Sequence, residues 1–136
     1  TGNYFDRSGG PGIRFEGTHD RLPHITIVGN IIYRSGAPHW RTLADDENSQ
    51  MILRHLAGLV CTGNTCRVNP DDGMTGVFSP QYGIIYGSLE DSVVKDNVLH
   101  KGALKQLFVD EGKHGPNVVV EHNLGSLHPP VTNNPQ

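Results

Sequence analysis

The stretch ITIVGNII, residues 25–32, carries the pattern that decides the fold of this chain. Apolar residues alternate with others up to a glycine–asparagine pair, and a second apolar run follows. The same phrase recurs around Asn64, Asn97 and Asn123, and a truncated copy with Asn3 opens the sequence. Successive asparagines are 27, 34, 33 and 26 residues apart (3 to 30 to 64 to 97 to 123). A period of this length indicates an array of stacked units.

Each unit contains three strand-like runs, which we name A, B and C in chain order, with the asparagine between B and C. The B runs carry the phrase itself. The A runs precede it at 12–16, 50–54, 83–86 and 106–110, and the C runs follow it at 4–7, 31–34, 65–68 and 98–100. Three short strands per unit leave no room for the helix of a βαβ unit. We therefore expect an all-β chain, a β-solenoid of about four coils built from parallel sheets.

The alternation within the runs predicts which side chains face the core. Apolar residues or cysteines stand three places before and two places after the asparagines: Ile27, Cys61, Val94, Val120, Phe5, Ile32, Cys66 and Leu99. Positions two before the asparagine are mostly polar and are expected to face outward. The asparagines fall at the bend between B and C. There they could act as local turn formers, but their recurrence in five copies favours a ladder of amides bonded between coils.

The two cysteines, Cys61 and Cys66, occupy inward positions in place of apolar residues. We expect buried, reduced thiols there rather than a metal site or a nucleophile. No CxxC or HExxH spacing supports metal binding, and two cysteines are too few for a disulfide framework.

Composition narrows the classes of function. The chain contains 17 Gly and 9 Pro, and only 35% of its residues are hydrophobic. This composition favours short strands and turns over a helix bundle. The net charge of −3 is scattered, with no Lys/Arg run, which argues against a nucleic-acid partner. No apolar stretch approaches the roughly 18 residues needed to cross a membrane, so we expect no membrane insertion. We expect residues 1–127 to form the solenoid, beginning inside a coil as a fragment of a larger protein, and 128–136 to form an irregular tail.

Residues 1–127, with their asparagine-bearing bends, resemble the pectate-lyase-like superfamily of right-handed parallel β-helix proteins. Residues 83–127 also look like "right-handed β-helix region" proteins of polysaccharide-degrading bacteria. The resemblance implies a right-handed, single-stranded parallel β-helix, a polysaccharide partner and a secreted or cell-surface location. It does not fix the chemistry, because this scaffold hosts lyases, hydrolases, epimerases and non-catalytic tailspike or adhesin segments.

Two long insertions, residues 36–48 and 69–81, leave the same corner of successive coils between run C and the next run A. Insertions gathered on one face of a solenoid often mark the binding face. We therefore expect a site beside the outer face of the sheet of A runs, which in the superfamily is the saccharide groove. By alternation, that outer face should carry Arg14, Glu16, Ile52, Arg54, Ile85, Phe108 and Asp110.

Arginines beside carboxylates suit an anionic sugar and the removal of a proton next to its carboxylate. The candidate catalytic residues are Arg14, Arg54, His39 and Asp72, with His39 as a base. The candidate substrate-binding residues are Trp40, Arg41, Glu16, Tyr82 and Asp110, with Trp40 and Tyr82 stacking on a sugar ring. No metal or cofactor is required, although Asp45, Asp46, Asp71 and Asp72 offer oxygen ligands for Ca²⁺.

Most of these candidates also have an interpretation without function. The charged residues of the A runs are typical of a solvated face with cross-strand ion pairs. Trp40 could hold its own loop, and paired aspartates in a Gly-rich loop usually form turns and caps. The apolar Ile52, Ile85 and Phe108 weaken the case for catalysis.

Three hypotheses of function follow. The leading one is a carbohydrate-active domain acting on an acidic polysaccharide as a lyase or hydrolase. The second is a non-catalytic structural or glycan-binding segment that stacks on the remainder of a parent chain or in a homo-oligomer, because an uncapped end exposes sheet edges. The third is a Ca²⁺-stabilised structural repeat.

Overall fold

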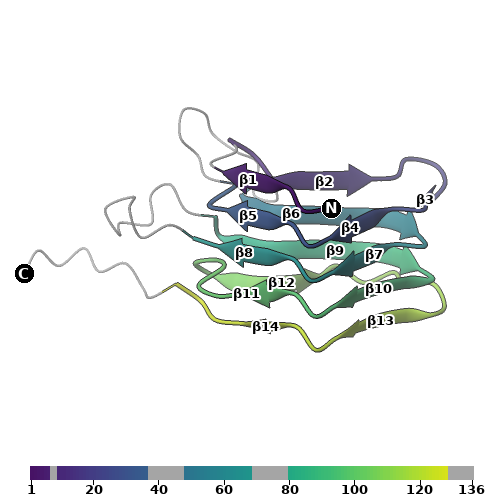
Figure 1. Cartoon of the computed structure of the whole chain (residues 1–136). Helices are drawn as coiled ribbons and strands as arrows, with labels where there is room; N and C mark the ends of the chain where they lie inside the picture. The colour runs from purple at the N-terminus through teal and green to yellow at the C-terminus, as the bar shows by residue number, and fades with distance from the viewer. Residues whose placement is uncertain (7–8, 37–47, 69–79, 129–136) are drawn as a thin grey trace, which may run out of the picture.

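The computed structural model describes residues 1–6, 9–36, 48–68 and 80–128, and within these ranges the chain is all-β, with no helix (Figure 1). The strands form three parallel sheets, which we name after the runs they contain. Sheet A holds β2 (Ile13–Glu16), β6 (Ser49–Ala57), β9 (Tyr82–Glu90) and β12 (Gln106–Asp110), with β3 (Leu22–Pro23) beside β6. Sheet B holds β4 (Thr26–Val28), β7 (Val60–Thr62), β10 (Ser92–Lys95) and β13 (Val118–Glu121). Sheet C holds β1 (Tyr4–Asp6), β5 (Ile31–Tyr33), β8 (Thr65–Arg67), β11 (Val98–Leu99) and β14 (Leu124–Gly125).

Each strand pairs in parallel with the equivalent strand of the next unit, so the units stack in chain order (Figure 1). The expected parallel strands and stacked sheets are confirmed. The long strands β6 and β9 extend beyond the A runs that the sequence outlined, because each continues past a left-handed residue, His55 (φ 55°) or Ser88 (φ 50°).

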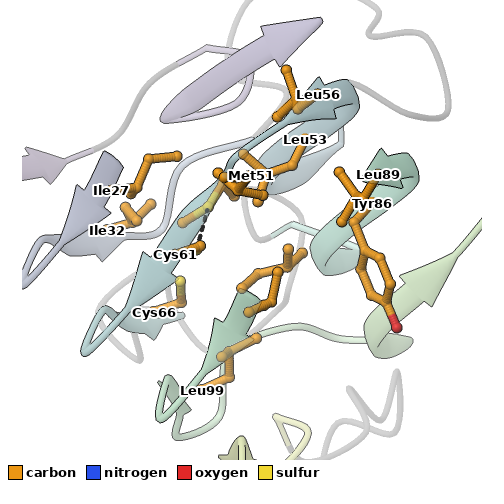
Figure 2. Close-up of a cluster of buried hydrophobic side chains, with 13 residues drawn as sticks. Ile27, Ile32, Met51, Leu53, Leu56, Cys61, Cys66, Tyr86, Leu89 and Leu99 are labelled. Carbon is orange, nitrogen blue, oxygen red and sulfur yellow. Dashed lines mark hydrogen bonds between the residues drawn. The ribbon is translucent and has the colours of Figure 1, made fainter. Parts of the chain in front are cut away.

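The expected inward positions form the core. Registers align Ile27 with Cys61 and Cys61 with Val94 in sheet B, and Ile32 with Cys66 in sheet C. All five side chains are buried, and the equivalent residues at the two ends of the stack are half-buried. Figure 2 shows Cys61 beside Met51 of sheet A, with Ile27, Ile32 and Cys66 in the same buried cluster, to which Val94 also belongs. The parity that the sequence predicted for sheets B and C is therefore confirmed.

The asparagines form the expected ladder. Each Nδ2 donates to the Oδ1 of the next asparagine, at 3.1, 3.1, 2.9 and 3.0 Å from the first pair to the last. Each acceptor Oδ1 also receives the backbone N–H of the preceding asparagine. Asn30, Asn64 and Asn97 are fully buried, at 3%, 1% and 0% exposure. These amides satisfy backbone groups that the bend leaves without sheet partners.

The residue before each asparagine explains the Gly-or-polar position of the repeat. All five have left-handed φ values between 54° and 67°: Gly2, Gly29, Gly63, Asp96 and His122. Glycine adopts this conformation freely, and short polar residues tolerate it better than β-branched ones. The conformation of the bend therefore explains why a glycine or a polar residue, followed by asparagine, recurs in every unit.

Both cysteines are buried and free, as expected. Burial raises the pKa of Cys61 to about 12, although a hydrogen bond from Asn64 opposes the shift. Burial also raises the pKa of Cys66 far above its ordinary value. Because a neutral thiol is neither a good nucleophile nor a metal ligand, these side chains act as small core residues.

The predicted phase of β12 is wrong. Phe108 pairs with Ile84 and Asp110 with Tyr86, and both partners belong to the hydrophobic core. Phe108 and Asp110 therefore lie in inward rows at the end of the stack, and Val109 takes the outward position. The run QLFVD holds three adjacent apolar residues, so its alternation fits either phase.

The outer face of sheet A also differs from expectation at two isoleucines. Ile52 and Ile85 stand in the outward row with Arg14, yet they are only 0% and 3% exposed. They do not line an open groove. At the C-terminal end, His128, where we expect an irregular tail to begin, is buried and donates its N–H to Ala103 O at 2.9 Å. Residues 129–136 lie outside the described residues.

Candidate functional site

On the outer face of sheet A, the row that lies two residues beyond Arg14, Ile52 and Ile85 carries most of the charge. Registers align Glu16 with Arg54 and Arg54 with Gly87, and Glu111 follows at the end of β12, where its N–H donates to Tyr86 O. Arg54 donates to both carboxylate oxygens of Glu111, through Nε at 2.7 Å and Nη2 at 3.0 Å. This two-point geometry holds the guanidinium in a fixed orientation.

Glu16 connects Arg54 to a second arginine. Its Oε1 lies 3.9 Å from Nη1 of Arg54, and its Oε2 lies 2.8 Å from Nη2 of Arg14. The interpretation as cross-strand ion pairs therefore holds for Arg54, which pairs with Glu16 and Glu111, whereas Arg14 and Glu16 pair within β2. Such exposed pairs contribute little to stability, so their effect is chiefly to set the charge pattern of this surface.

Gly87 makes the Arg54–Glu111 pair possible. Arg54 and Glu111 lie on either side of β9, with Gly87 in the row between them. A Cβ at position 87 would lie 2.9 Å from the Cβ of Glu111, closer than carbon atoms approach without displacement. The absence of a side chain therefore lets a glutamate reach an arginine two strands away.

A pocket of about 440 Å³ opens over this row. Its lining combines charged, hydroxyl and backbone groups: Glu16, Arg54, His55, Gly87, Ser88, Glu111, Gly112 and Lys113. Its size lies within the range of about 300–1,000 Å³ typical of small-molecule sites. Its polar lining suits a ligand rich in hydroxyl or carboxylate groups.

His55 and Ser88 occupy the corner of the pocket, at the left-handed positions of β6 and β9. His55 Nδ1 lies 2.8 Å from Ser88 Oγ, and His55 Nε2 lies 3.2 Å from the carbonyl oxygen of His19. Arg21 approaches the same hydroxyl, with Nη2 at 3.4 Å, and its Nε donates to Ser88 O at 3.0 Å.

The structure brings three of the sequence candidates together and leaves others apart. Arg14, Glu16 and Arg54 belong to one network on the outer face of sheet A. Tyr82 begins β9, far along the strand from Ser88; it is not among the pocket's lining residues and has the ammonium of Lys105 5.8 Å from its ring centroid. The candidates His39, Trp40, Arg41 and Asp72, and the possible Ca²⁺ ligands Asp45, Asp46 and Asp71, lie outside the described residues.

Asp110 does not lie on the outer face, in contrast to the expectation. Its Oδ1 accepts hydrogen bonds from the N–H of Gly112 at 2.8 Å and from His114 Nε2 at 2.7 Å. His114 Nδ1 accepts the N–H of Leu89, and its ring stacks on Tyr86 with centroids 5.9 Å apart. Partial burial acts to raise the pKa of Asp110, but these hydrogen bonds outweigh it and lower the pKa. The pair covers the end of the core.

Four residues of this pocket have no clear signal in the sequence: His55, Ser88, Glu111 and Lys113. The left-handed residues of β6 and β9 interrupt the alternation, so the A runs seemed to end at Arg54 and Tyr86. One signal was present: a polar residue followed by leucine stands just before the last residue of both strands, as His55-Leu56 in β6 and Ser88-Leu89 in β9.

In the ranges that the structure covers, no group of three or more His, Cys, Asp or Glu side chains is placed to hold a metal ion. No helix in the described part of the chain is long and apolar enough to cross a membrane. No protein-family model, curated protein or solved structure matches this chain.

Proposed function

We propose that this chain is a segment of a right-handed parallel β-helix of the pectate-lyase-like type, and that it binds and processes a polysaccharide in the pocket beside sheet A. The observation that carries the proposal is the polar pocket of about 440 Å³ over the row from Glu16 to Glu111. The resemblance of the repeat to the pectate-lyase-like superfamily also supports a secreted or cell-surface location.

The lining offers what a sugar requires. Carboxylates accept hydrogen bonds from sugar hydroxyls, and arginine and lysine donate to hydroxyl or uronate oxygens. Glu16 and Glu111 are held by Arg54, so they are already oriented when a sugar arrives. A uronate carboxylate would compete with Glu111 for Arg54, with Lys113 beside it in the lining. We therefore favour an acidic polysaccharide.

Two reactions are compatible with these groups. In β-elimination, Arg54 would neutralise the uronate carboxylate while a base removes the neighbouring proton. The glycosidic C–O bond would then break to form the unsaturated uronide, and the departing sugar oxygen would take the proton back from the base. In hydrolysis, two carboxylates such as Glu16 and Glu111 would act as acid and base or nucleophile on opposite sides of the glycosidic bond. Both require the Arg54–Glu111 pair to open when substrate binds, which is feasible because the Glu111 side chain is 39% exposed.

The test is incubation of the protein with a panel of acidic and neutral polysaccharides. Products are read by mass spectrometry and by the ultraviolet absorbance of unsaturated uronides. An unsaturated product identifies β-elimination, and a saturated product identifies hydrolysis. In either case Arg54→Gln should abolish turnover and Glu121→Gln, an exposed change on sheet B, should not. Absence of product and of binding with every glycan, in folded protein, would refute the proposal.

A second candidate function is a non-catalytic structural segment. The observation that favours it is a hollow of about 330 Å³ at the β1–β2 end of the stack, lined in part by the half-buried Phe5, Ile13 and Phe15. Such a surface suits stacking against further coils of a parent chain or a second copy. It predicts a stable oligomer by light scattering, whereas a groove enzyme can be a monomer.

A further inference from the structure

The hydrogen bonds around His55 define its tautomer. The carbonyl oxygen of His19 can only accept, so the hydrogen of the neutral ring lies on Nε2, which faces it at 3.2 Å. Nδ1 then carries a lone pair, and Ser88 Oγ, at 2.8 Å, is its donor. A serine hydroxyl thus donates to an imidazole whose far nitrogen is held by a third group, the arrangement that activates serine nucleophiles.

We propose that Ser88 is the nucleophile and His55 the general base of an acyl-transfer site that cleaves esters. Both side chains line the pocket beside sheet A, so a substrate that enters the pocket can reach the hydroxyl. We assign the substrate class as an O-acylated sugar; the sugar part of this assignment rests on the proposed function, and the ester part does not.

The reaction balances with these residues and water alone. Ser88 Oγ bonds to the carbonyl carbon of the ester while its proton passes to His55 Nδ1. The bond from carbon to the sugar oxygen then breaks, and the sugar alkoxide takes that proton and leaves as an alcohol. Water attacks the acyl-serine and gives a proton to His55, which returns it to Ser88 Oγ as the carboxylic acid departs.

The negative charge on the tetrahedral intermediate needs hydrogen-bond donors. Backbone donors at the serine are occupied, because Ser88 N–H bonds to Gly112 O and Leu89 N–H bonds to His114 Nδ1. Arg21 Nη2 makes only long contacts, 3.4 Å to Ser88 Oγ and 3.4 Å to Lys113 O, and would exchange one of them for the developing oxyanion. Its Nε–Ser88 O bond and its Nη1–Glu90 ion pair fix the guanidinium there.

The same contact has a purely structural interpretation. His55 and Ser88 stand at equivalent bends of successive units, as the asparagines do. A structural pair predicts that replacing either residue changes only stability. The two interpretations differ in one respect, which is the reactivity of Ser88 towards acylating reagents.

The test uses the whole chain with 4-nitrophenyl acetate and with a fluorophosphonate probe, followed by peptide mapping. Neither reagent contains a sugar, so the outcome does not depend on glycan binding. We expect both reagents to modify Ser88, and Ser88→Ala to reduce ester hydrolysis to the level of the reagent in buffer. Ser126→Ala is the matched control, since that exposed hydroxyl lies outside the pocket lining and accepts the N–H of Lys101, and it should retain full rate.

His55→Gln separates base catalysis from hydrogen bonding. Glutamine can still accept from Ser88 and donate to His19 O, but it cannot take up the proton, so we expect hydrolysis to fall by about a hundredfold or more. Circular dichroism confirms the fold of each variant, and Ser88→Ala decides alone if His55→Gln does not fold. Wild-type protein that is folded yet neither labelled at Ser88 nor faster than Ser88→Ala would overturn the proposal.

Discussion

Replacing Asn64 by alanine should destabilise the chain far more than the same change at Asn3. Asn64 is central in the ladder and 1% exposed, whereas Asn3 lies at its end and is exposed. Asn64 Oδ1 accepts from both the backbone N–H and Nδ2 of Asn30, and its Nδ2 donates to Asn97 Oδ1 and Ile27 O.

The expected magnitude follows from the groups left without partners. In Asn64→Ala, two buried donors of Asn30 lose their acceptor, at about 1–3 kcal/mol each, whereas Asn97 Oδ1 keeps the N–H of residue 64. We expect the free energy of unfolding to fall by about 4 kcal/mol. In Asn3→Ala the backbone N–H keeps its bond to Asn30 Oδ1, and the loss of one half-exposed bond should cost about 1 kcal/mol.

Urea unfolding followed by far-ultraviolet circular dichroism measures both changes. The m-values should agree, so that the shift in midpoint reports stability alone. Asn97→Ala provides an independent repeat, since its amide also donates to Asn123 Oδ1 and Cys61 O. Equal losses of about 1 kcal/mol for Asn64→Ala and Asn3→Ala would refute the reasoning that the buried ladder stabilises the stack.

Three other perturbations have expected outcomes. Gly87→Ala should displace Glu111 from Arg54, because the new Cβ would lie 2.9 Å from the Cβ of Glu111. Since a uronate competes with Glu111 for Arg54, uronate binding should strengthen about tenfold by calorimetry, and unchanged affinity would contradict this. The lowered pKa of Asp110 means that its ionised form stabilises the fold. This stabilisation is fully present above the pKa of the unfolded chain, about 3.9, and is lost as the pH falls through the lower pKa of the folded protein. Asp110→Asn should therefore lower the melting temperature at neutral pH, with a loss of stability of at most about 1 kcal/mol. The difference in melting temperature between wild type and variant should shrink below about pH 4. A difference that does not change with pH would show that the Asp110 carboxylate does not stabilise the fold. Cys61 and Cys66, whose thiol pKa values burial raises, should resist a thiol reagent in native protein and react in urea, and rapid native reaction would show that they are not buried.

The periodic elements of the fold could be predicted because one bend imposes the same requirements in every unit. A left-handed residue followed by a buried amide leaves a Gly-or-polar plus Asn signature, and the flanking strands alternate clearly around Asn30 and Asn64. The core positions of sheets B and C follow from that alternation. Sheet A was harder to predict because its long strands β6 and β9 continue past His55 and Ser88, whose left-handed backbone interrupts the alternation, so that each run seems to end too early.

The candidate site could be predicted only in part. Its place beside sheet A and the residues Arg14, Glu16 and Arg54 follow from alternation in two clearly patterned strands. Glu111 could not be found this way, because its partnership with Arg54 depends on a missing side chain at Gly87. The His55–Ser88 contact depends on the register of two bends, which no local pattern records.

The central claim is that the polar pocket beside sheet A binds an acidic polysaccharide. Isothermal titration of the protein with uronate oligosaccharides, comparing wild type with Glu111→Gln and Glu121→Gln, tests it most directly. We expect saturable binding whose affinity rises at least tenfold in Glu111→Gln, because residue 111 no longer competes with the uronate for Arg54, and stays unchanged in Glu121→Gln. Equal affinities in all three proteins would place the ligand elsewhere and contradict the claim.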